Sequence, residues 1–255
     1  WNIAYKPNSF GTLYFEWTNN TGTSVDLTSL TINEAGQFLL KNTGNENITI
    51  PTFNLDPDDT QRIEIGNDND GDIIIGAATN ITGTQGLKTV SLKTFNDGDI
   101  TLGTPGTSGL PDLQNITSIA LIASKNGNIT LGDLGATTSI NKISSLSMTT
   151  EGGAISIGNI KAKKIDAVNA SGSEFSSISI GNIEIDEAID LITLSGDGSI
   201  TIGNFTGDGT VKLDASNMTK EGIILNFTAL KGSVDITSTG KDDTISLGIE
   251  AGKVI

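Results

Sequence analysis

The sequence predicts an all-β protein built as a parallel β-helix (β-solenoid), with an aromatic-rich β region at its N-terminus. A short segment of the form Gly-x-Ile-Ser/Thr-Ile/Leu-Gly recurs along the chain, which indicates a repeat architecture. β-Branched residues dominate, and no apolar stripe of helical period extends over roughly 12 residues. These observations favour stacked coils of short strands over helices.

The repeated segment defines the coils. Its copies are Gly98–Gly103, Gly127–Gly132, Gly153–Gly158, Ser176–Gly181, Gly198–Gly203 and Asp243–Gly248, after a degenerate first copy at Ile73–Gly76. The distance between successive closing glycines falls from 29 to 22 residues between Gly103 and Gly203. This period fits one coil of a β-solenoid.

Within each copy, aliphatic residues alternate with serine or threonine. Because side chains in a strand point to opposite faces in turn, the aliphatic residues are expected inside and the hydroxyls outside. The expected inward pairs are Ile100/Leu102, Ile129/Leu131, Ile155/Ile157, Ile178/Ile180, Ile200/Ile202 and Ile245/Leu247. The flanking glycines are interpreted as corner positions with φ > 0.

A second strand-like segment lies between successive copies, so each coil carries at least two strands. These segments are Thr89–Phe95, Ile116–Ala123, Ile143–Met148, Ile165–Ala170, Ile189–Leu194, Val211–Ala215 and Val234–Thr237. Single strands joined by short turns favour a parallel coil. An antiparallel sandwich is the alternative that periodicity by itself does not separate.

The first 60 residues differ in composition. Both tryptophans, both tyrosines and four of the eight phenylalanines lie at or before Phe53. We expect residues 1–60 to form a cap or a small β domain and residues 61–255 to form the solenoid, with a linker near 56–59. Because the chain starts at Trp1 without methionine and stops in mid-pattern at Ile255, it is interpreted as a piece of a longer protein.

Composition removes several function classes. The chain has no histidine, no cysteine and a formal net charge of −15, and Arg62 is its single arginine. Ser-His-Asp and Cys-His catalysis, histidine-ligated zinc and disulfides are therefore excluded. The acidic surface disfavours nucleic acid. The chain has no run of roughly 18 apolar residues, so no transmembrane segment is predicted. The absence of cysteine suits an exported bacterial protein.

Residues 209–248 resemble a known family. The segments are Leu213–Thr219, Gly222–Asn226, Ala229–Thr237 and Thr239–Gly248. They are similar to repeats of bacterial surface-layer (S-layer) proteins and large adhesins of Gram-negative bacteria. The resemblance implies a secreted, calcium-dependent cell-surface protein of the repeats-in-toxin type that assembles into a lattice. The chain departs from that pattern, because only Gly240–Ile245 approaches the calcium-binding nonapeptide.

Two groups of aspartates are candidate calcium ligands. Asp68, Asp70 and Asp72 have the i, i+2, i+4 spacing that suits a hard cation. A solvated polar turn is the alternative, and the EF-hand pattern fails at Ile73, where that loop needs glycine. The family resemblance adds Asp242 and Asp243, for which a plain coil corner is the alternative.

The sequence therefore predicts a non-enzymatic structural component of a bacterial cell-surface layer. We expect it to self-assemble through lateral contacts aided by calcium, with a cell-surface polysaccharide as a further candidate partner. A cell-surface adhesin is the nearest alternative. A polysaccharide-degrading enzyme ranks third, because glycoside hydrolysis needs two carboxyl groups about 5–9.5 Å apart and Asp99 aligns with Asn128, Ala154, Ser177 and Ser199 in later coils.

Overall fold

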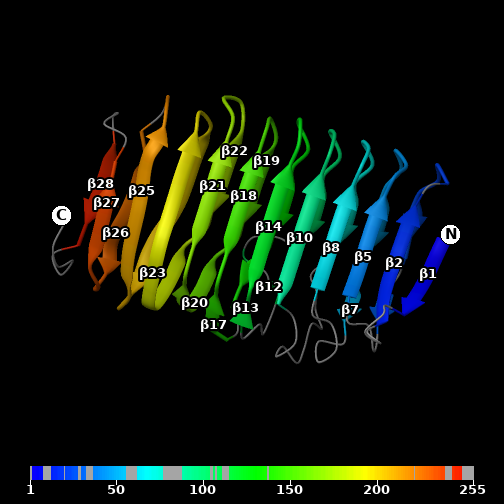
Figure 1. The fold of residues 1–255 in the computed structure, drawn as a ribbon, viewed down its shortest axis with the longest axis horizontal. Helices are drawn as coiled ribbons and strands as arrows, with labels where there is room; N and C mark the ends of the chain where they lie inside the picture. Colours follow the sequence, from blue (N-terminus) through cyan, green and yellow to red (C-terminus); the bar gives the residue numbers. More distant parts are fainter. Residues whose placement is uncertain are drawn as a thin grey trace.

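A computed structural model shows an elongated stack of coils, with the N-terminus at one end and the C-terminus at the other (Figure 1). The structure describes residues 2–7, 13–19, 21–27, 30–32, 37–55, 62–76, 88–103, 106, 108–110, 115–136, 138–220, 222–238 and 243–248. These residues form strands and turns, with no helix. In the part of the chain that is described, no helix has the length and apolar character needed to cross a membrane.

One set of strands lies side by side along the front of Figure 1, and we call these the front strands. They are β2 (Leu13–Asn19), β5 (Gln37–Asn42), β8 (Arg62–Asn67), β10 (Thr89–Thr94), β14 (Ser118–Ala123), β18 (Leu146–Thr150) and β21 (Val168–Gly172). The long strands β23 (Ile183–Gly196) and β25 (Thr210–Met218) continue the set, and β27 (Val234–Thr237) ends it.

The repeated segments form a second set, which we call the motif strands. They are β3 (Val25–Asp26), β6 (Ile48–Ile50), β9 (Ile73–Ile75), β11 (Ile100–Leu102), β15 (Ile129–Leu131), β19 (Ala154–Ile157), β22 (Ser177–Ile180), β24 (Ser199–Gly207), β26 (Ile224–Leu230) and β28 (Thr244–Leu247). Each front strand is followed in the chain by a motif strand.

Further strands close the coils. They are β4 (Leu30–Ile32), β7 (Phe53–Leu55), β12 (Ser108–Leu110), β13 (Asn115–Ile116), β16 (Asp133–Leu134), β17 (Ile140–Ile143) and β20 (Ile160–Ile165). The N-terminal part of β23 continues this set, because Ile160 pairs with Ile183. Strand β1 (Asn2–Pro7) lies beyond β2 at the N-terminal end.

Equivalent strands of successive coils pair in parallel. Thr101, for example, lies between Ile74 and Thr130, and Thr130 pairs onward with Ser156. The one antiparallel pair among the described strands is β1 with β2. The predicted parallel β-solenoid is thus confirmed, and the antiparallel sandwich is not adopted.

The core is a set of aliphatic columns that run along the stack. One column passes through Ile73, Ile100, Ile129, Ile155 and Ile178, and all five are at most 1% exposed. Similar columns run under the front strands. Each aliphatic side chain therefore packs between its counterparts in the coils above and below, and these columns make up most of the buried interior of the described coils.

Two details differ from the sequence expectation. The last expected inward pair is only partly buried, and Leu247 is 39% exposed, because β28 pairs on one side only among the described residues. Of the closing glycines, only Gly103 has φ > 0, at 67°. The other closing glycines therefore serve a purpose other than a left-handed corner.

The N-terminal coils join the rest of the stack without a break in pairing. Strand β5 pairs with β8 across position 60, over six residues in register from Gln37/Arg62 to Asn42/Asn67. The division into residues 1–60 and 61–255 stays a prediction. The linker expected at 56–59 lies outside the described residues.

Candidate functional site

The motif strands are flanked by two columns of asparagine and aspartate side chains. The column that precedes the strands consists of Asn47, Asp72, Asp99 and Asn128, and we call it the leading ladder. The column that follows them consists of Asp133, Asn159, Asn182 and Asn204, and we call it the trailing ladder. Both link neighbouring coils through bonds from backbone to side chain.

In the leading ladder, each side-chain oxygen accepts a hydrogen bond from the backbone N–H of the equivalent residue in the next coil. The N–H of Asp72 donates to Asn47 Oδ1 at 2.8 Å, and the N–H of Asp99 donates to Asp72 Oδ1 at 3.0 Å. Asp99 Oδ1 then accepts from the N–H of Asn128 at 2.8 Å. The bonds to Asp72 and Asp99 are charge-assisted, and such bonds are stronger than the neutral bond to Asn47.

The trailing ladder has the same hydrogen-bond pattern at the other end of the motif strands. The N–H of Asn159 donates to Asp133 Oδ1 at 2.7 Å, and the N–H of Asn182 donates to Asn159 Oδ1 at 2.9 Å. The N–H of Asn204 continues the series to Asn182 Oδ1 at 2.9 Å. Asp133 starts the ladder as a nearly buried carboxylate, 9% exposed.

The closing glycines make room for the trailing ladder. A Cβ atom on Gly158 would lie closer than 3.0 Å to Asp133 Oδ1 and to the backbone N of Asp133. A real Cβ does not approach other atoms this closely, so a larger residue would push the ladder oxygen away. The repeat requires glycine here because another coil passes close by.

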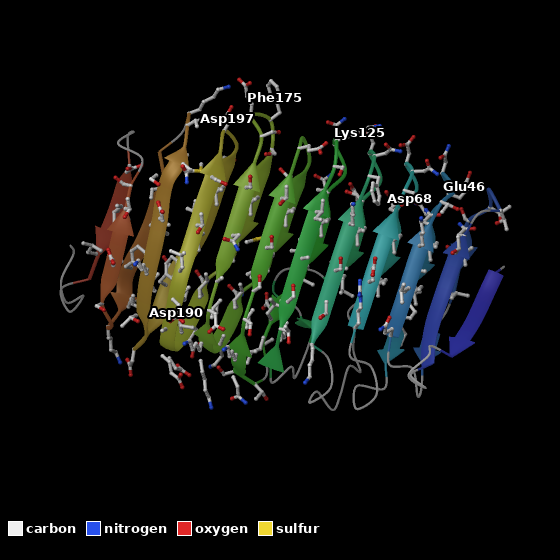
Figure 2. All side chains as sticks on the ribbon, viewed as in Figure 1. Glu46, Asp68, Lys125, Phe175, Asp190 and Asp197 are labelled. Carbon is white, nitrogen blue, oxygen red and sulfur yellow. The ribbon has the colours of Figure 1, made fainter. Side chains whose placement is uncertain are left out.

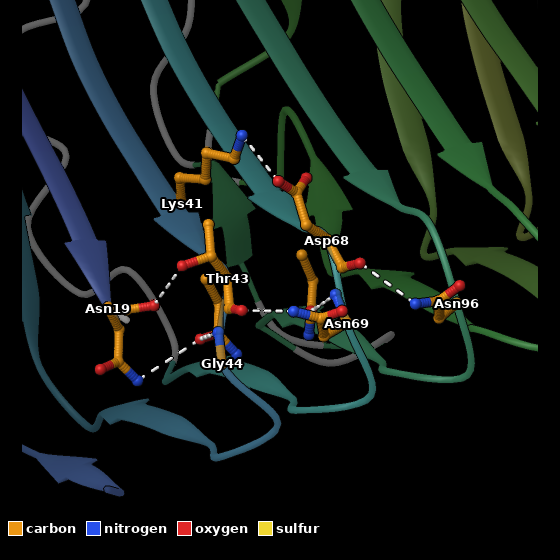
Figure 3. Close-up of polar contacts among 9 residues, drawn as sticks. Asn19, Lys41, Thr43, Gly44, Asp68, Asn69 and Asn96 are labelled. Carbon is orange, nitrogen blue, oxygen red and sulfur yellow. Dashed lines mark hydrogen bonds and ion pairs between the residues drawn. The ribbon is translucent and has the colours of Figure 1, made fainter. Parts of the chain in front are cut away.

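The turns that follow the front strands form a second polar region (Figure 3). Asn42, fully buried at the end of β5, accepts from the N–H of Gly44 at 3.2 Å and donates through Nδ2 to the carbonyl of Glu46 at 2.8 Å. Its side chain therefore holds the turn closed from inside. Asn67 occupies the same position one coil later and accepts from the N–H of Asn69 at 3.0 Å.

Neighbouring turns are also joined to one another. Thr43 Oγ1 donates to the carbonyl of Asn19 at 2.9 Å, and Asn69 Nδ2 donates to the carbonyl of Thr43. Asn96 Nδ2 reaches the carbonyl of Asp68 at 3.1 Å. The dashed lines of Figure 3 follow these contacts from turn to turn, so the edge is a connected network.

The structure places the three aspartates of the predicted calcium turn in different surroundings. Asp68 forms an ion pair with Lys41 at 2.6 Å, Asp70 is exposed, and Asp72 belongs to the leading ladder. Among the described residues, no three acidic side chains are grouped so that they would hold a metal ion. Calcium at these residues stays a prediction.

The second predicted pair lies near the C-terminal end. Asp243 Oδ1 accepts from the N–H of Ile223 at 3.0 Å, so this carboxylate links β28 to the preceding coil. Asp242 lies outside the described residues.

A charged column crosses the opposite edge of the later coils, where Figure 2 labels Asp190. Lys142 pairs with Asp166 at 2.7 Å, and Lys164 pairs with Asp190 at 2.9 Å and with Asp166 at 3.6 Å. The hydrogen bond from Lys142 lowers the pKa of Asp166, and the hydrogen bond to Asp190 raises the pKa of Lys164. Lys164 thereby separates two carboxylates that would otherwise repel each other.

Sequence reasoning missed both ladders. Aligning the copies at their closing glycine and reading one residue further shows aspartate or asparagine at 133, 159, 182 and 204. Extending the alignment one coil backwards from Asp99 reaches Asp72, so the leading ladder does place two aspartates in adjacent coils. Comparison of the chain with protein-family models, curated proteins and solved structures finds no match.

Proposed function

We propose that this chain is a structural segment of a bacterial cell-surface layer, which self-assembles through lateral contacts aided by calcium. Its role is mechanical. Parallel pairing satisfies the backbone along the axis, and the ladders fix the corners, so the stack is a stiff rod whose long sides are available to neighbours.

One observation carries the proposal. Carboxylates recur along the edge formed by the turns after the front strands, where Figure 2 labels Glu46, Asp68 and Asp197. Glu46 is exposed, whereas Asp68 and Asp197 are half-buried and pair with Lys41 and Lys220. Asp70, Asp97 and Glu151 belong to the same row of turns and are also exposed. With a net charge of −15, two such edges repel each other, and divalent cations that bridge carboxylates of two copies would offset the repulsion.

Electron microscopy of the purified chain at increasing calcium concentration tests this function. Ordered two-dimensional sheets are expected with calcium, and a chelator should return single rods. Single rods at every calcium concentration would contradict self-assembly. Sheets that persist in chelator would contradict the part assigned to calcium.

A pair of matched variants locates the contact. Asp70→Asn with Asp97→Asn removes two charges from the turn edge and is expected to raise the calcium concentration for half-assembly severalfold. Asp186→Asn with Glu187→Gln removes two exposed charges from β23, away from those turns, and should leave that concentration nearly unchanged.

A further inference from the structure

A groove of about 460 Å³ follows the trailing ladder along the outside of the later coils. Its lining includes Asp133, Asn159, Asn182 and Asn204, together with Lys161 and Glu184. Four consecutive coils contribute a ladder residue, so the groove runs along the axis of the stack. With about 4.8 Å between paired strands, these residues span about 14 Å.

The amides in this groove are held in fixed orientations. The Oδ1 atoms of Asn159 and Asn182 each accept a backbone N–H from the next coil at 2.9 Å. Asn204 Oδ1 accepts from Asn226 Nδ2 at 2.6 Å. Because each carbonyl oxygen is engaged, the side chain does not rotate freely, and its NH₂ group points in a defined direction.

Donors remain available for a ligand. Asn182 and Asn204 are exposed, and neither Nδ2 group donates a hydrogen bond within the described part of the chain. Acceptors lie beside them, because Glu184 is half-exposed and pairs with Lys161 at 2.9 Å. A ligand would thus meet rigid donors and acceptors without the cost of ordering them.

We propose that this groove binds a neutral linear glycan lying along the solenoid axis. Asn159, Asn182 and Asn204 place one amide group in each coil, about 4.8 Å apart, and an extended neutral glycan presents hydroxyl groups at a comparable spacing along its length. An extended peptide rises about 3.3 Å per residue and does not match that repeat. An acidic polymer would be repelled by the net charge of −15. The proposal goes beyond self-assembly and does not depend on it.

The experiment is an NMR titration of the calcium-free monomeric chain with cellohexaose, a neutral β-1,4-linked hexasaccharide. The side-chain NH₂ signals of Asn182 and Asn204 and the backbone signals of Ile183 and Glu184 are expected to shift saturably. Hexagalacturonate and a threonine-rich hexapeptide are expected to cause no saturable shift. Working without calcium keeps this result separate from the assembly test.

A conservative double variant tests which groups bind. Asn182→Asp with Asn204→Asp keeps an oxygen at each ladder position but replaces both NH₂ donors, and should weaken cellohexaose binding at least tenfold. The control, Asn169→Asp with Asn217→Asp, adds the same charge at exposed positions outside the groove lining and should bind as the parent does. An unchanged thermal midpoint shows that both variants are folded.

Several results would overturn the proposal. These are no saturable shift with cellohexaose, shifts confined to residues outside the groove, or equal binding by the two double variants. Saturable binding of hexagalacturonate alone or of the peptide alone would overturn the assignment of a neutral glycan.

Discussion

The earlier and the later coils share one core but secure their corners on opposite sides of the motif strand. From Asn47 to Asn128 the leading ladder joins the coils, and from Asp133 to Asn204 the trailing ladder does so. The change from the leading ladder to the trailing ladder occurs at strand β15, which lies between Asn128 and Asp133 in the sequence. The comparison teaches that the aliphatic columns define the fold, while polar side chains that bridge the coils are interchangeable supports.

The largest expected effect concerns the shared core. Leu102→Ala in the earlier coils and Ile180→Ala in the later coils should each lower the free energy of unfolding by about 2–5 kcal/mol, because both side chains are at most 2% exposed. Denaturant unfolding measures both values. A loss confined to one region would show that the columns are not equivalent.

The closing glycine gives the next largest effect. Gly158→Ala should destabilise the chain by about 1–3 kcal/mol, since the added methyl group would overlap Asp133 of the previous coil. Gly66→Ala is the matched control, because a Cβ there meets no atom within 4 Å. Equal thermal midpoints for the two variants would disprove the steric role of the closing glycine.

The ladder bonds themselves should contribute less. Asn159→Ala removes the acceptor for the N–H of Asn182 and should cost about 1 kcal/mol. Asn159→Asp keeps that acceptor but replaces the Nδ2 donor to Asp133 Oδ2 with a second carboxylate, and should cost at least as much. Asn128→Ala makes the same change in the leading ladder, where Asn128 Oδ1 accepts from the N–H of Ala154. Chemical denaturation should give similar losses for the two alanine variants. A loss in only one of them would show that the ladders are not interchangeable.

The smallest effect depends on pH and belongs to the later coils. The pKa of Asp166 is lowered in the folded chain. Its contribution to the free energy of unfolding is therefore fully present above the unfolded pKa of about 3.9 and is lost as the pH falls through the folded pKa. Asp166→Asn should remove that part of the acid dependence of stability, which amounts to well under about 1 kcal/mol for a surface ion pair that water still reaches. An unchanged acid profile would show that the pairing with Lys142 does not stabilise the fold.

The sequence was sufficient to predict the motif strands and their buried faces. Alternation of Ile129 and Leu131 with Thr130 specifies one inward face, and the period of the copies specifies stacking. The strand β20 was not predicted, because Lys164 breaks the alternation that starts at Ile160 and Ala162. Such a strand forms because its partners β16, β17 and β23 supply the hydrogen bonds.

The polar features were harder to predict, since they depend on register between coils. The spacing of Asp68, Asp70 and Asp72 suggests a chelating loop when it is considered alone. In the folded chain, Asp68 faces Lys41 and Asp72 faces Asn47, both from the preceding coil. The spacing of neighbouring residues does not reveal these partners, because they lie more than 20 residues away in the sequence.

The central claim is that equivalent residues stack in register along the axis, and distances between spin labels test it most directly. Thr49 and Ser156 are separated by four in-register steps, and Thr49 and Thr201 by six. Labels on cysteines introduced at these positions should lie about 19 Å and about 29 Å apart, at about 4.8 Å per step. Two distances that do not increase with the number of coils would contradict the solenoid.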